Sequence, residues 1–142
     1  MSVSAILAEK GRKVVTANTN TTIKDIIKTL AEKKIGAAVV LSDQEQVCGI
    51  VSERDVVREI ARSGASVLNE PVSTCMTNKV VSCGEHDSID ELMEKMTQGR
   101  FRHLPVIDND KLTGIISIGD VVKRKIRQAE LDAEDMKRYI AG

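Results

Sequence analysis

Apolar residues recur along two stretches of the chain with the spacing of an amphipathic helix. Across residues 23–31, isoleucine, leucine and alanine fall at i, i+3, i+4, i+7 and i+8, which places them on one helical face. Residues 89–96 repeat the pattern with isoleucine, leucine and methionine. Both stretches follow residues typical of a capping box, which are Thr22 with Asp25 and Ser88 with Glu91. The pattern predicts two helices that each bury one side.

Short β-branched and aliphatic runs follow each predicted helix, in pairs around a polar turn. The pairs are residues 37–41 with 47–51, and 104–107 with 112–116. Residues 108–110, Asp-Asn-Asp, are typical of a hairpin turn. A short extended segment is expected before each helix, at 14–16 and 80–82, and a second helix after each strand pair, beginning near Ser52 and Ser117. The order β-α-β-β-α is therefore predicted twice.

The predicted elements occur twice because the sequence is a tandem duplication. Residues 49–57 recur as 114–122 with six of nine positions identical, and residues 35–40 align with 101–106. Two copies are too few for a stacked solenoid, so we expect an α+β fold in which the copies pack face to face about a pseudo-twofold axis. The expected segments are a first repeat at 3–68, a second at 72–128, a connector at 64–71 and a C-terminal helical extension at 129–142.

Composition and charge exclude several classes of protein. The 142 residues are 42% apolar and carry 21 basic and 21 acidic side chains, a balance that argues against a dedicated nucleic-acid-binding protein. The longest apolar run has seven residues, whereas a membrane-spanning helix needs about 20. No signal-like segment begins the sequence, and Cys48, Cys75 and Cys83 form no C-x-x-C pair. We therefore expect reduced thiols in a cytoplasmic protein, with a metal or redox site as the alternative.

The last predicted helix continues beyond Val122 almost to the end of the chain. Ile126, Ala129, Met136 and Ile140 keep roughly helical spacing, while basic residues are followed by interspersed acidic ones. Such mixed charge is typical of a solvated helical face. The apolar side could cover the protein's own core or a second subunit.

A Ser-x-x-Asp motif marks the strand-to-helix junction of each repeat, as Ser52 with Asp55 and Ser117 with Asp120. One interpretation is structural, because a serine N-cap and an acidic first turn satisfy free amides and complement the helix dipole. The other is functional, because a carboxylate fixed there can accept hydrogen bonds from both hydroxyls of a ribose. The functional interpretation requires carboxylates that are neither free in bulk solvent nor sealed behind methyl groups.

The two repeats resemble the cystathionine β-synthase (CBS) domain. The resemblance rests on Arg102-His103-Leu104-Pro105-Val106-Ile107-Asp108 with Gly114-Ile115-Ile116-Ser117-x-x-Asp120, and on the matching first copy, Gly36-Ala37-Ala38-Val39-Val40 with Gly49-Ile50-Val51-Ser52-Glu53-Arg54-Asp55. The chain looks like a stand-alone tandem CBS pair, or Bateman module, with no catalytic domain. The resemblance implies a regulatory protein that senses energy or redox state by binding AMP, ADP, ATP or NAD(H). It also implies a homodimer and a regulated protein of unknown identity.

In that family, each of two nucleotide-binding clefts combines residues of both repeats. Carried over, one cleft comprises Ser117, Gly119 and Asp120 with Thr16, Ile35, Gly36 and Ala37. The other comprises Ser52, Arg54 and Asp55 with Thr77, Ser82, Phe101, Arg102 and His103. The resemblance places Asp55 and Asp120 on ribose, and Ser52 and Ser117 on ribose or phosphate. It places backbone near Ala37 and His103 on adenine, and Arg54, Arg102 or His103 on phosphate.

The chain departs from the family pattern at two of these positions. Arg102 precedes His103, where family members often have the reverse order, so the two phosphate roles could be exchanged. The first copy has the uncharged Gly36-Ala37 there, which leaves its cleft without an evident phosphate anchor.

Two other functions compete with nucleotide binding. Catalysis is disfavoured because the two histidines, His86 and His103, have no Cys or Ser at nucleophile spacing. Glu85, His86 and Asp87 are adjacent, unlike the ligands of most metal sites. We therefore expect no enzyme, no catalytic cofactor and no metal. The remaining alternative is a structural dimerisation module whose Ser-x-x-Asp motifs are only helix caps.

Overall fold

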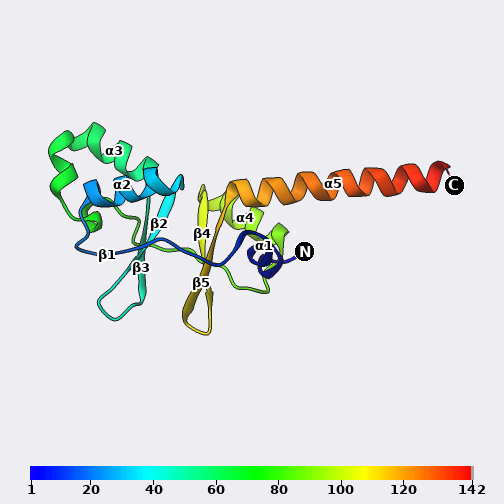
Figure 1. Cartoon of the computed structure of the whole chain (residues 1–142), viewed down its shortest axis with the longest axis horizontal. Coiled ribbons are helices and arrows are strands. Elements are labelled where there is room, and N and C mark those ends of the chain that lie inside the picture. Colours follow the sequence, from blue (N-terminus) through cyan, green and yellow to red (C-terminus); the bar gives the residue numbers. More distant parts are fainter. Residues whose placement is uncertain (142) are drawn as a thin grey trace. The chain divides into compact units, whose positions relative to one another are not determined.

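The computed structural model describes residues 1–141 and has a mixed α+β architecture, which confirms the predicted fold class (Figure 1). The helices are α1 (Val3–Lys10), α2 (Ile23–Lys33), α3 (Glu53–Ser63), α4 (Ile89–Gly99) and α5 (Ile118–Ala141), with short 3₁₀ helices η1 (Ala65–Asn69) and η2 (Val72–Thr74). The strands are β1 (Thr16–Asn18), β2 (Ala37–Leu41), β3 (Val47–Ser52), β4 (His103–Asp108) and β5 (Lys111–Ser117). Within the described residues, no helix combines the length and the apolar character that a bilayer span requires.

These elements form two compact units. Unit 1 comprises Met1–Arg12, Ser82–Asp108 and the chain from Thr113 onward, so α1 belongs with α4, β4, α5 and most of β5. Unit 2 comprises Lys13–Val81 and Asn109–Leu112, so η1 and η2 belong with β1, α2, β2, β3 and α3. The N-terminal helix therefore packs with the elements of the second repeat, while the segment that follows α3 packs with those of the first.

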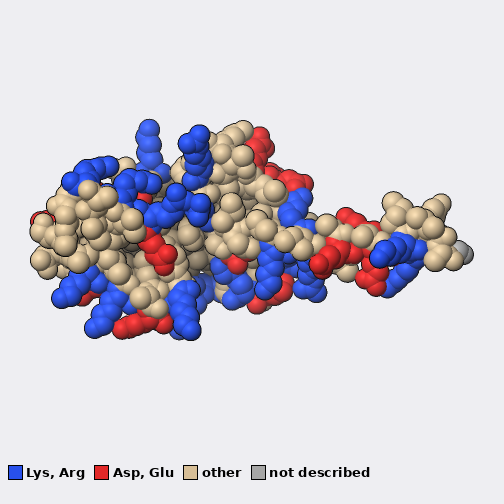
Figure 2. Space-filling view, turned by 90° about the horizontal axis from the view of Figure 1, so that it is seen from above, with Lys and Arg blue, Asp and Glu red and all other residues tan. Residues whose placement is uncertain are grey.

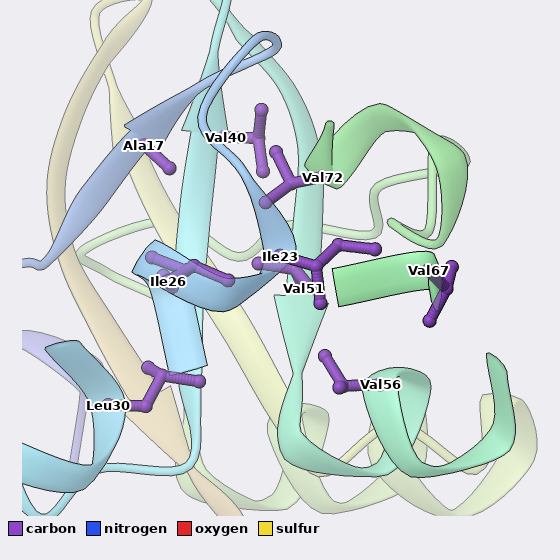
Figure 3. Packing of buried hydrophobic residues seen from close by; sticks show 10 residues of the cluster. Ala17, Ile23, Ile26, Leu30, Val40, Val51, Val56, Val67 and Val72 are labelled. Carbon is purple, nitrogen blue, oxygen red and sulfur yellow. The ribbon is translucent and has the colours of Figure 1, made fainter. Parts of the chain in front are cut away.

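Unit 2 is built on a three-stranded sheet in the order β1-β2-β3. Strand β1 runs parallel to β2, with Thr16 opposite Val39, and β2 runs antiparallel to β3, with Ala37 opposite Ser52. The apolar stripe predicted for α2 faces this sheet and joins a core that also includes side chains from η1 and η2 (Figure 3). Ala31, the last expected member of the stripe, is instead exposed. The buried members of this core are Ala17, Ile23, Ile26, Leu30, Ala38, Val40, Val51, Val56, Val67 and Val72. The connector between the repeats is thus part of the core of unit 2.

Unit 1 is built on the β4–β5 hairpin, covered by α1, α4 and the start of α5. Asn109 and Asp110 have φ values of 49° and 62°, as the two central residues of a type I′ hairpin turn require. The predicted turn is therefore confirmed. Helix α1 buries Val3, Ile6 and Leu7. Helix α4 buries three members of its predicted apolar stripe, Ile89, Leu92 and Met96, but the fourth, Met93, is 39% exposed, so the prediction was wrong for that residue.

The two extended segments expected before α2 and α4 differ from the prediction. The first strand begins at Thr16, where the expected segment 14–16 ends, although the carbonyl of Val15 already accepts the amide of Val39 at 3.0 Å. Residues 80–82 form no strand, and Cys83 makes only an isolated parallel bridge to Val106. The chain turns immediately after that bridge, because the Asp87 carboxylate accepts the Gly84 amide at 2.9 Å.

The same close contact occurs once in each unit. A Cβ added at Gly114 would lie 2.7 Å from Leu7 Cδ2, and one added at Gly49 would lie 2.5 Å from Met76 Sδ. Both glycines occupy the second strand of a hairpin, and Leu7 and Met76 occupy matching positions of the duplicated segments 3–7 and 72–76. Segment 3–7 packs against β5 and segment 72–76 packs against β3. The same packing arrangement therefore occurs in both units.

The predicted capping residues start α2 and α4. Thr22 Oγ1 accepts the Asp25 amide at 3.1 Å, and Ser88 Oγ accepts the Glu91 amide at 3.1 Å. The serine or threonine half of each expected capping box is therefore confirmed.

Candidate functional site

In unit 2, β3 passes directly into α3 through Ser52 and Asp55. The Asp55 amide donates to Ser52 Oγ at 3.2 Å, while Asp55 Oδ2 accepts the Ser52 amide at 2.9 Å and the Ser52 hydroxyl at 3.1 Å. These reciprocal bonds form a complete capping box. The other carboxylate oxygen, Oδ1, lies 3.9 Å from Arg58 Nη1.

In unit 1, β5 passes into α5 through Ser117 and Asp120 with the same reciprocal bonds. The Asp120 amide donates to Ser117 Oγ at 3.2 Å, and Asp120 Oδ2 accepts the Ser117 amide at 2.9 Å. Here a lysine is added, because Lys10 Nζ donates to Asp120 Oδ2 at 2.7 Å and to the Ile115 carbonyl at 2.9 Å. Both Ser-x-x-Asp motifs therefore make the hydrogen bonds of helix caps, as the structural interpretation expects.

The lysine changes the electrostatics of Asp120. Burial alone would raise the pKa of this carboxyl group, but the hydrogen bond from Lys10, the bonds from Ser117 and the positive charge of Lys10 outweigh it. The pKa of Asp120 is lowered as a result, so the group is a carboxylate at neutral pH.

Both carboxylates are partly accessible. The Asp55 side chain is 14% exposed and the Asp120 side chain is 23% exposed. Neither therefore lies free in bulk solvent or sealed behind methyl groups, which is the condition that the functional interpretation sets. Ribose binding by these groups stays a prediction.

The start of each preceding hairpin strand lies beside the cap of the same unit. In unit 2, the Gly36 carbonyl accepts the Glu53 amide at 3.0 Å, and Ala37 pairs with Ser52. In unit 1, the Arg102 carbonyl accepts the Ile118 amide at 2.8 Å. In each unit the start of one strand therefore lies next to one Ser-x-x-Asp cap, and this strand start is uncharged in unit 2 and basic in unit 1.

The remaining predicted residues of unit 2 lie around its sheet. Thr16 is exposed at the start of β1, and Ile35 packs against the core of the unit. Arg54 is exposed in the first turn of α3. Thr77 is half-buried and exchanges backbone hydrogen bonds of 2.8 and 3.0 Å with Ile50 of β3.

The remaining predicted residues of unit 1 lie at the ends of its elements. The Ser82 carbonyl accepts Lys95 Nζ at 3.1 Å. Phe101 is half-buried after α4, Arg102 is exposed beside it, and His103 begins β4. Gly119 is exposed in the first turn of α5. Each expected cleft draws on residues of both units, and that combination stays a prediction.

Lys10 is the site residue that the sequence analysis missed. Leu7 is buried against Gly114 of β5, and Lys10 follows it by three residues, on the same face of α1. The lysine therefore reaches the end of β5 and the start of α5. The spacing of the apolar residues in α1 was the signal that could have put Lys10 on the packed face of the helix. Using that signal requires α1 to be assigned to the unit of the second repeat.

The cysteines are free thiols, and two of them have raised pKa values. Burial, assisted by the negative charges of Asp55 and Glu59, raises the pKa of Cys75 to about 11. Burial, with a contribution from the charge of Asp87, raises the pKa of Cys83 to about 12. Both groups are therefore protonated thiols at neutral pH. Across residues 1–141, no cluster of three or more His, Cys, Asp or Glu side chains is arranged to hold a metal ion.

Comparison with known proteins identifies the family. The CBS domain profile matches the chain twice, at residues 4–62 and 72–127. A CBS-domain-containing protein of Agrobacterium tumefaciens has 48% sequence identity and a TM-score of 0.84, over 87% of this chain and 92% of that one. A mitochondrial CBS domain-containing protein of Arabidopsis thaliana, CBSX3, is 30% identical over 149 residues, which cover 99% of this chain and 72% of the relative. The chain therefore belongs to the CBS domain family, as a tandem pair.

A third similar protein was solved with a ligand. The CBS domain protein of Pyrobaculum aerophilum complexed with AMP has 28% sequence identity and a TM-score of 0.76, over 84% of this chain and 89% of that one.

Proposed function

We propose that this chain is a regulatory module that binds an adenine nucleotide, with Asp55 and Asp120 each accepting hydrogen bonds from ribose hydroxyls. The observation that carries the proposal is the repeated capping box with a partly accessible carboxylate. In both boxes the serine is bonded to Oδ2, so Oδ1 is the oxygen that a hydroxyl can approach while the helix cap stays intact.

The proposal is supported by the chemistry around each carboxylate. Arg54 is exposed one residue before Asp55, and Lys10 contacts Asp120 directly. Each cation can bind a phosphate oxygen next to a carboxylate that holds the sugar. The AMP complex of the Pyrobaculum relative is consistent with a ligand that has both parts.

The finer parts of the function are proposals as well. The ligand is AMP, ADP, ATP or NAD(H), and its occupancy is reported to a regulated protein as a signal of energy or redox state. The chain acts as a homodimer in the cytoplasm and has no catalytic activity of its own.

Thermal unfolding in the presence of nucleotides tests this function. A ligand at about 100 times its Kd stabilises the folded chain by about 2.7 kcal/mol. We expect AMP, ADP, ATP or NAD(H) to raise the melting temperature, and GMP at equal concentration to raise it less. If no adenine compound shifts the transition of the wild-type chain, the motifs are only helix caps and the chain is the structural dimerisation module described above.

Matched variants separate ligand binding from helix capping. Asp55→Asn with Asp120→Asn removes both proposed ribose acceptors. Asp25→Asn with Glu91→Gln neutralises the acids at the same N3 position of α2 and α4. We expect the nucleotide-induced shift to be lost only in the first pair. Equal loss in both pairs would show that general helix stability, and not ribose binding, determines the response.

A further inference from the structure

Helix α5 carries an unpartnered apolar stripe. Val122, Ile126, Met136 and Ile140 are all about half or more exposed, and Tyr139 beside them is 86% exposed. From Lys125 to Ala141 the residues are exposed except for Gln128. This part of α5 therefore contributes nothing to the core of unit 1, and its apolar side remains to be covered.

The stripe follows a strict 3-4 spacing over almost three heptads. Its six members, in the order d, a, d, a, d, a, are Val122, Ile126, Ala129, Ala133, Met136 and Ile140. Such a repeat is the seam of a two-stranded coiled coil, in which each apolar residue packs into the facing helix. Leu131 is also about half exposed but occupies an f position, outside the seam.

The charges that flank the seam select its partner and orientation. In a parallel pair of identical helices, the g residue of one helix faces the following e residue of the other. Lys125 would then face Glu130 of a second copy, and Asp132 would face Lys137 of a second copy. Each contact has opposite charges, and symmetry makes each occur twice.

The antiparallel alternative is less favourable. The register that pairs all six seam residues places Lys123 against Lys137, and Glu130 and Asp132 each against itself. A register shifted by one heptad relieves this repulsion but leaves two seam residues at one end of each helix without a partner. Both basic and acidic side chains occur along α5 (Figure 2), with the acidic ones at 130–135 lying between basic ones at 123–127 and 137–138. The helix therefore lacks the excess of positive charge that attracts anionic lipid surfaces.

We propose that α5 pairs with α5 of a second copy of this chain as a parallel coiled coil over residues 122–140. This interface does not depend on nucleotide binding. Lys125 is engaged by Asp90 of its own unit at 2.6 Å, so the contact between Lys125 and Glu130 would have to compete with this ion pair. The contact between Asp132 and Lys137 is free of that competition, although Asp132 accepts an exposed hydrogen bond from Gln128 at 3.0 Å.

Sedimentation equilibrium of the full chain, without nucleotide, tests the interface. Ile126→Glu places a charge in the seam, whereas the control Leu131→Glu places it at an exposed f position of the same helix. We expect the wild-type chain to be a dimer. We expect Ile126→Glu to raise its dissociation constant by roughly a hundredfold, since two buried isoleucines are lost per dimer, and Leu131→Glu to leave it nearly unchanged.

Charge exchange tests the orientation. Asp132→Lys and Lys137→Asp should each weaken the dimer about fivefold, and the double variant should recover the wild-type value. In the full antiparallel register, Lys137→Asp would instead strengthen the dimer, because the introduced carboxylate would face Lys123. A monomeric wild type, a dimer insensitive to Ile126→Glu, equal effects of Ile126→Glu and Leu131→Glu, or no recovery in the double variant would overturn the proposal. Nucleotide-induced melting shifts are measured separately, so this interface and the proposed nucleotide binding can fail independently.

Discussion

The two strand-to-helix junctions have the same capping bonds but different cations. At the junction of unit 2, the nearest cation is Arg58, 3.9 Å from Asp55 on the same helix. At that of unit 1, Lys10 reaches across from α1 and binds Asp120 at 2.7 Å. The bonds that start a helix are required by both copies, since an uncapped end leaves amides unsatisfied. The surrounding charge is not constrained in this way, and the two sites are therefore expected to differ in affinity and ligand preference.

A second difference between the units concerns Glu85 of unit 1. Glu85 is buried, and it accepts hydrogen bonds from Arg12 at 2.8 Å and from Thr113. The hydrogen bond from Arg12, followed by that from Thr113, lowers the pKa of Glu85 below its usual value. The duplicated positions in unit 2 carry uncharged residues, which are Thr19, Val81 and Cys48. Polar stabilisation was thus distributed unequally after the duplication, while the apolar packing was retained.

Alanine substitutions at the two glycines of these close contacts should give the largest difference in stability between the two units. Gly114→Ala brings a methyl group 2.7 Å from Leu7, which is branched and fully buried, so we expect a loss of about 1–3 kcal/mol in the free energy of unfolding. Gly49→Ala meets the flexible thioether of Met76 and should cost less than about 1 kcal/mol. Urea unfolding measures both values. Gly84→Ala is the control, because its nearest side-chain atom is 3.7 Å away; a larger loss at Gly49 than at Gly114 would contradict the packing described here.

Removing the serine caps should affect the two units equally. Ser52→Ala and Ser117→Ala each delete the acceptor of a first-turn amide, and each should lower the free energy of unfolding by about 1 kcal/mol. Urea denaturation of both variants measures the effect. If Ser117→Ala proved harmless while Ser52→Ala did not, Lys10 rather than the box would be holding Asp120 in place.

Replacing the lysine should have the smallest effect, and it should depend on pH. Because the folded pKa of Asp120 lies below its ordinary value of 3.8, its carboxylate stabilises the fold above that pH, and the contribution is lost as the pH falls through the lowered pKa. Lys10→Gln should therefore cost about 0.5 kcal/mol near neutral pH and progressively less in acid. Chemical denaturation over a range of pH measures the difference. Arg58→Gln at the other junction should change little, and a pH-independent cost of Lys10→Gln would contradict the ion pair.

Local patterns in the sequence were sufficient for most secondary structure. The stripes of α2 and α4, their caps, the hairpin turn at Asn109-Asp110 and the helices after Ser52 and Ser117 depend on neighbouring residues. The strand expected at 80–82 was wrong, because these residues pair with no strand; the neighbouring Cys83 makes an isolated bridge to Val106, and the chain then turns at Gly84. A short β-branched run does not reveal whether a partner strand is available.

Only part of the candidate site could be predicted from the sequence. The Ser-x-x-Asp motifs could be found because their bonds span three residues and the duplication repeats them. Lys10 could not be assigned to Asp120, since the two are far apart in the sequence and α1 packs in the unit of the second repeat. Tertiary contacts of this kind depend on which unit each terminal segment of a repeat packs in.

Isothermal titration calorimetry with AMP tests the central claim most directly, namely that the two capped carboxylates hold a ribose. We predict saturable binding to the wild-type chain, partial loss in Asp55→Asn or Asp120→Asn alone, and full loss in the double variant. The Asp25→Asn, Glu91→Gln control should bind as the wild type does. Undiminished binding to the double variant would contradict the claim, because the ligand would then not depend on either carboxylate.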